Sequence, residues 1–89
     1  MMTLDEEMDR AARASTLMRD PMLIEAFIGL EEYYTEAWKD SPLNEAGDRE
    51  TIYRYLAALR EVRGHLEQFI RTGALASSQR DSMTKTALS

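Results

Sequence analysis

The clearest helical pattern in the chain is residues 48–72, DRETIYRYLAALREVRGHLEQFIRT. Its apolar residues recur at steps of three and four, the spacing that places side chains on one face of an α-helix. The predicted seam consists of Ile52, Tyr55, Leu59, Val62, Leu66 and Phe69, with Leu56 and Ile70 widening it. Thr72 and Gly73 follow, and glycine readily adopts the left-handed conformation that ends many helices. We therefore expect a long amphipathic helix over 48–72.

Two shorter helices are predicted before it. Thr3 and Glu6 have the spacing of a capping box, which favours a first helix over residues 4–18. Asp20 followed by Pro21 supplies an N-cap and a first-turn proline, so a second helix is predicted over residues 21–39. The turn-forming residues of the segment 40–47, DSPLNEAG, then predict the loop of a helical hairpin.

No strand pattern interrupts these helices, so the predicted fold class is all-α. We expect a short N-terminal helix and a long antiparallel helical hairpin, forming a single three-helix domain over residues 1–76. From Ser77 onward serine, threonine and isolated charges dominate, with too little apolar surface to offset the entropy of ordering. Residues 77–89 are therefore predicted to be a flexible polar tail.

Several features favour self-association. A chain of 89 residues buries only about 60 to 65% of the surface that it exposes when unfolded, so a monomer is marginally stable. The third helix is longer than the second, and its far end needs cover from the first helix or from another subunit. The first half of the second helix is apolar nearly all round. We predict a homo-oligomer whose self-association residues are Met22, Ala26, Gly29, Tyr33, Leu66, Phe69 and Ile70.

Charge is unevenly distributed along the chain, which carries 11 basic and 16 acidic side chains and a net charge of −5. The acids of the second helix are expected to face the bases of the third, with Glu31, Glu32 or Glu36 meeting Arg49, Arg54 or Arg60. An acidic face that binds a basic partner surface is the alternative. The negative total disfavours nucleic-acid binding by a monomer. A ring of copies could still gather Arg49, Arg54 and Arg60 as anion contacts.

The sequence argues against catalysis and against a bound cofactor. There is no cysteine, and His65 is the only histidine, which leaves a helical metal site with half of its usual imidazole ligands. No glycine-rich phosphate loop appears, and no catalytic triad can be argued from one histidine. We expect no enzyme activity, no metal and no cofactor. The acidic N-terminus is unlike a signal peptide and no apolar run approaches roughly 18 residues, so we expect a cytoplasmic protein without a membrane partner.

Two aromatic residues fall outside the predicted seams, near the loop end of the hairpin. Large amphipathic rings outside a core are enriched at interfaces. Together with the acids of the second helix they define the predicted partner-binding residues, which are Trp38, Tyr53, Glu32 and Glu36.

The chain resembles short helical proteins encoded in the genomes of tailed bacteriophages and prophages. The resemblance covers roughly residues 20–76 and is carried by Glu36, Ala37, Trp38, Ser41, Pro42, Arg49, Glu50, Ile52, Tyr53, Val62, Arg63, His65, Leu66, Thr72, Gly73, Leu75 and Ala76. It implies a DNA-packaging small terminase subunit, a head or tail accessory protein, or an inhibitor of host defence. The chain departs from the small terminase plan because it has no recognisable N-terminal helix-turn-helix with a basic recognition helix.

Three functional hypotheses follow. The first is a non-catalytic, self-associating helical hairpin protein that binds a host or viral protein, with inhibition of a host defence component as one role; its location would then be the host cytoplasm. The second is an oligomeric subunit for DNA packaging or capsid assembly. The third is an oligomeric sponge for a signalling nucleotide, bound between subunits.

Overall fold

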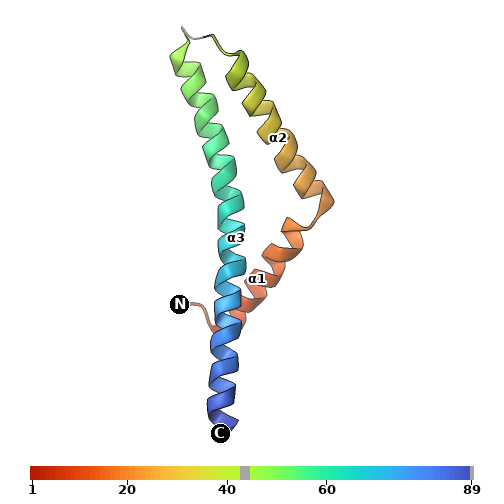
Figure 1. The fold of residues 1–89 in the computed structure, drawn as a ribbon, viewed down its shortest axis with the longest axis vertical. Coiled ribbons are helices and arrows are strands. Elements are labelled where there is room, and N and C mark those ends of the chain that lie inside the picture. Colours follow the sequence, from red (N-terminus) through yellow and green to blue (C-terminus); the bar gives the residue numbers. More distant parts are fainter. Residues whose placement is uncertain (43–44, 89) are drawn as a thin grey trace. The chain divides into compact units, whose positions relative to one another are not determined.

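The computed structural model describes residues 1–42 and 45–88, which form three α-helices and no β-strand (Figure 1). These are α1 (Leu4–Met18), α2 (Pro21–Asp40) and α3 (Ala46–Leu88). The predicted all-α class is confirmed. Leu43 and Asn44 of the predicted loop lie outside the described residues.

The starts of α1 and α2 lie where the capping residues predict them. The backbone N–H of Glu6 donates to Thr3 Oγ1 at 3.1 Å, and the Thr3 hydroxyl donates to Glu6 Oε1 at 3.0 Å. At α2 the Asp20 carboxylate accepts from the backbone N–H groups of Met22, at 2.8 Å, and Leu23, at 3.3 Å. Each cap satisfies amides that have no partner inside the first helical turn.

The predicted end of the third helix is wrong. α3 does not stop at Thr72 and Gly73 but continues to Leu88, so residues 77–88 are helical instead of a flexible tail. No glycine among the described residues has a positive φ, and Gly73 therefore does not act as a left-handed C-cap. Gly73 is instead a buried residue in the middle of a helix, and its role is in packing.

The chain divides into two compact units, whereas the sequence predicts one domain. The first, here called the terminal unit, contains Met1–Arg19 and the chain from His65 onward. The second, here called the hairpin unit, is Asp20–Gly64. α3 supplies residues to both units, so its two halves have different neighbours.

Small residues form the core of the terminal unit. Ala14 and Ala76 are buried, as is Gly73. A Cβ atom placed on Gly73 would collide with the Cβ of Ala11 and would lie 3.2 Å from the carbonyl oxygen of Glu7. α1 and α3 therefore approach each other so closely that only glycine fits at this point.

The hairpin unit is an antiparallel pair of α2 and the first half of α3. Contacts along the pair join Trp38 with Arg49 near the loop, then Tyr34 with Tyr55, and Phe27 with Arg63 farther away. α2 diverges from α3 toward Pro21 (Figure 1). The guanidinium carbon of Arg63 lies 5.2 Å from the centre of the Phe27 ring.

The core line of α3 in the hairpin unit differs from the predicted seam. Its inward residues are Ile52, Leu56, Leu59 and Arg63, of which Leu56 is buried and the others half-buried. Tyr55 and Val62, which the apolar pattern places on the seam, are each 52% exposed. The prediction fails because a charged residue, Arg63, occupies a core position that an apolar pattern does not count.

None of the helices in the described part of the chain is both long and apolar enough to span a bilayer.

Candidate interaction surface

One side of the hairpin unit exposes a continuous set of apolar side chains. On α2, Met22, Ala26, Gly29, Leu30 and Tyr33 follow one another at helical spacing and share a face. All of them are exposed, including Met22 at 73% and Tyr33 at 67%. The predicted self-association residues of α2 therefore lie together on an open surface.

An aromatic row links this α2 face to α3. The ring centres of Tyr33 and Tyr34 are 5.4 Å apart, and those of Tyr34 and Tyr55 are 5.5 Å apart. On α3, Tyr55, Ala58 and Val62 follow at helical spacing and are exposed. We call this two-helix surface the apolar flank; it consists of Met22, Ala26, Gly29, Leu30, Tyr33, Tyr55, Ala58 and Val62.

The opposite side of the hairpin unit carries ion pairs. Glu31 lies 3.5 Å from Arg60 and 3.6 Å from Arg63, measured between carboxylate oxygens and guanidinium nitrogens. This confirms the predicted pairing of Glu31 with Arg60 and adds Arg63 to it. Ile24 and Ile28 precede Glu31 on the same helical stripe and are exposed. We call this side the ionic flank. Its centre is charged, and the apolar flank contains no ionisable acid or base apart from its tyrosines.

The predicted partner-binding residues fall into two groups. Trp38 and Tyr53 lie at the loop end on the ionic flank, because Arg49 covers the Trp38 ring at 4.6 Å and Tyr53 follows Arg49 by one helical turn. Glu32 and Glu36 are exposed on the outward side of α2, on a different face from Trp38. The structure thus places the two aromatic residues on the same flank and the two glutamates on another face of α2.

Arg49 also fixes the chain at the end of α2. Its Nη1 donates to the Ser41 carbonyl oxygen at 2.8 Å and to Ser41 Oγ at 3.1 Å. The same guanidinium stacks on the indole of Trp38, a favourable cation–π geometry. Arg49 therefore has a structural role that sequence spacing does not reveal.

The three predicted anion contacts do not converge within one copy of the chain. Arg49 binds the Trp38 ring and Ser41, Arg54 pairs with Glu50 at 2.8 Å, and Arg60 pairs with Glu31. Arg49 and Arg60 share the ionic-flank side of α3, while Arg54 points to another side. An anion would have to displace these partners to bind.

The remaining predicted self-association residues lie in the terminal unit, where α1 covers them in part. Leu66, Phe69 and Ile70 are half-buried. The guanidinium carbon of Arg10 lies 4.4 Å from the centre of the Phe69 ring, and Ile70 lines a shallow depression with Met18 of α1. The sequence predicts that either the first helix or another subunit covers the far end of the third helix. In the structure the first helix covers it in part.

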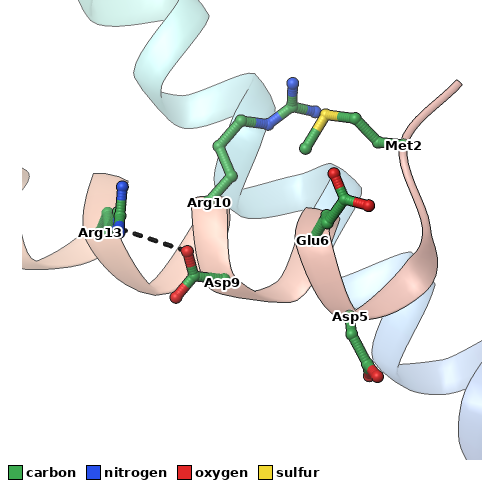
Figure 2. Close-up of a pocket in the computed structure, with 6 residues that line it drawn as sticks. All are labelled: Met2, Asp5, Glu6, Asp9, Arg10 and Arg13. Carbon is green, nitrogen blue, oxygen red and sulfur yellow. Dashed lines mark ion pairs between the residues drawn. The ribbon is translucent and has the colours of Figure 1, made fainter.

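A second depression in the terminal unit has a charged lining, drawn in Figure 2. Its residues are Met2, Asp5, Glu6, Asp9, Arg10 and Arg13. Asp9 pairs with Arg13 at 3.3 Å, and Asp5 pairs with Arg80 at 3.2 Å. Only the pair of Asp9 with Arg13 joins two lining residues, and the buried Nε of Arg10 has no hydrogen-bond partner within the described part of the chain. The arrangement offers no nucleophile with an adjacent base.

Metal-ligating side chains do not gather within residues 1–42 and 45–88: no three of the histidine, aspartate and glutamate residues there could hold one ion. His65 is exposed, and its ring centre lies 6.5 Å from that of Phe69.

Comparison of the chain with protein-family models, with curated proteins and with solved structures finds no match.

Proposed function

We propose that this protein is a non-catalytic, self-associating helical protein that works by binding other macromolecules through its hairpin unit. The observation that carries the proposal is the apolar flank. Five large apolar side chains on it, Met22, Leu30, Tyr33, Tyr55 and Val62, are between 43% and 73% exposed. Burial of such side chains is the main favourable term in protein association.

The size of the apolar flank supports a specific interface. Aromatic side chains bury roughly 150–250 Å² each; at about 200 Å² for each of these five side chains, their exposed parts amount to on the order of 600 Å². That area is at the upper end of the largest apolar patch on a typical monomer, about 300–600 Å². Two such patches facing each other bury on the order of 1,200 Å², the lower end of the range for specific complexes.

The loop end offers a second surface for a partner macromolecule of a different kind. Trp38 and Tyr53 are exposed there, and the Arg49 contacts hold the indole in place. Tryptophan, tyrosine and arginine are the residue types most enriched among binding hot spots. A host or viral protein is the class of partner that we assign to this end of the hairpin unit.

Molar mass in solution tests the proposed self-association. Light scattering on the wild-type chain is expected to give a multiple of the 10.2 kDa monomer mass. Tyr33→Glu places a charge on the apolar flank and is expected to give the monomer mass. Tyr53→Glu is a matched control, since Tyr53 is 60% exposed but lies on the ionic flank, and it is expected to keep the wild-type mass. A wild-type monomer at high concentration would refute the proposal.

A further inference from the structure

The shape and charge of the hairpin unit also indicate how a second copy sits on the apolar flank. The geometry points to a two-fold dimer in which α2 of one copy packs against α3 of the other, so that two hairpin units form a four-helix bundle. This inference rests on the proposed self-association and specifies its partner and orientation.

Contacts between α2 and α3 show which of their residues lie at the same level of the hairpin. The contacts Phe27 with Arg63, Glu31 with Arg60 and Tyr34 with Tyr55 show that residues whose numbers sum to about 90 are level. Consider a two-fold axis that runs along the hairpin, between its helices. Rotation about it exchanges the positions of α2 and α3, and each residue keeps its level along the axis. Each residue of α2 then faces a residue of the second copy's α3 at its own level.

At those levels the two helices have complementary side chains. Val62 of the second copy lies opposite four residues of α2. In knobs-into-holes packing, one side chain inserts between four residues of the facing helix, and Ala26, Gly29, Leu30 and Tyr33 have the spacing of such a hole. A Cβ atom placed on Gly29 meets no atom within 4 Å in one copy, so the hole is open at its base. Tyr33 lies near the level of Ala58, where a small residue leaves room for its ring.

The charges beside the apolar flank also favour packing of α2 on α3. The outward side of α2 next to the flank is acidic, with Glu25, Glu32 and Glu36 at helical spacing. The corresponding side of α3 carries Arg54, which is level with Glu36, together with the acids Glu50 and Glu61. If α2 packed on α2, six glutamates would line one seam and repel one another. If α2 packs on α3, Glu36 of each copy lies beside Arg54 of the other copy, which gives two opposite-charge pairs in the dimer.

The divergence of α2 from α3 toward Pro21 also favours this two-fold axis (Figure 1). Rotation by a half turn about the line that bisects the two helices superimposes the direction of α2 on that of α3. α2 of one copy therefore overlies α3 of the other along its length, and every helix is antiparallel to its neighbours, as in a four-helix bundle. A half turn about an axis perpendicular to that line would instead make the two copies of α2 cross each other. The two helices would then touch over a shorter length.

Cysteine cross-linking tests the orientation, and the chain suits it because it has no cysteine of its own. Gly29→Cys and Val62→Cys are made as separate single variants, one with a mass tag, and are mixed before mild oxidation. Gly29 has open space at its Cβ and Val62 is exposed, so both variants are expected to fold. Circular dichroism and the molar mass of each reduced variant check this. Glu7→Cys is a control outside the hairpin unit.

The expected result is a disulfide between the two different variants, with little cross-linking of either variant to itself. Self-linked Gly29→Cys and self-linked Val62→Cys would mean that α2 packs on α2, which overturns the orientation and leaves self-association intact. An assembled wild-type chain with no cross-link at either position would also overturn it, since the copies would then meet elsewhere. A monomeric wild-type chain would refute the proposed function itself, and the molar mass separates that outcome from the other two.

Discussion

The guanidinium carbon of Arg63 lies 5.2 Å from the centre of the Phe27 ring, and the same guanidinium lies 3.6 Å from the Glu31 carboxylate. A charged side chain thus takes a place in the core line of the hairpin unit. Because the inward line of α3 runs through Leu56 and Arg63, Tyr55 and Val62 lie on the outside. The position of Arg63 therefore explains why the hairpin unit has an apolar flank.

Replacing Arg63 is expected to weaken the hairpin unit more than replacing its neighbour. Arg63→Ala removes the packing of the side-chain stem and a cation–π contact, and we expect the free energy of unfolding to fall by about 1–2 kcal/mol. Arg60→Ala removes a more exposed pair with the same Glu31 and should cost less than about 0.5 kcal/mol. Urea unfolding at one fixed protein concentration measures both. Equal losses would show that Arg63 is a surface residue in solution.

Gly73→Ala is expected to loosen the contact between α1 and α3. Alanine stabilises an isolated helix by about 1 kcal/mol relative to glycine, but here its methyl group collides with the Cβ of Ala11. Overpacking of this kind costs about 1–3 kcal/mol. Gly64→Ala is the matched control, because its Cβ meets nothing within 4 Å, and it should raise stability. Thermal unfolding is the measurement. The account of Gly73 is wrong if both variants melt at higher temperature than the wild type.

Arg49→Ala is expected to change the surroundings of Trp38. The chain has a single tryptophan, so its fluorescence reports on the loop end alone. Loss of the guanidinium exposes the indole and removes two hydrogen bonds to Ser41, and we expect a red shift of the emission and a loss of about 1–2 kcal/mol of stability. Arg54→Ala, which removes a pair with Glu50 and no contact with Trp38, should leave the emission unchanged. An unchanged spectrum for Arg49→Ala would contradict the contact.

Charge reversal tests the pairing of Glu36 with Arg54 across the proposed dimer. Arg54→Glu places like charges together and is expected to weaken the dimer several-fold, since exposed ion pairs contribute about 0.2–1 kcal/mol each. Combining it with Glu36→Arg should restore much of the affinity, and the double variant keeps the net charge of the wild type. Sedimentation velocity over a concentration series gives the dissociation constants. Additive effects of the two changes would show that the residues do not meet.

Local signals in the sequence predict the helix starts, and they fail where tertiary contacts decide. Thr3 and Asp20 act within their own first turns, so their spacing alone is sufficient to place the starts of α1 and α2. Gly73 is of the residue type that commonly ends helices. Only the close approach of Ala11 explains why it lies inside α3.

The apolar flank is predictable only in part, because tertiary contacts decide which residues of α3 face inward. Met22 and Tyr33 belong to the self-association residues predicted on the second helix, and both are exposed. Tyr55 and Val62 continue an apolar pattern on α3, and no count of apolar residues could show that Arg63 displaces them from the core. Half of the apolar flank was therefore visible in the sequence, and half required the structure.

The central claim, that a second copy covers the apolar flank, is tested most directly by isotope-filtered nuclear Overhauser spectroscopy. One isotope-labelled and one unlabelled sample of the chain are mixed, and only contacts between copies are recorded. The account predicts contacts between the ring protons of Tyr33 in one copy and the methyl group of Ala58 in the other. Spectra that lack any contact between copies at Tyr33, Ala58 and Val62, recorded at millimolar concentration, would contradict it.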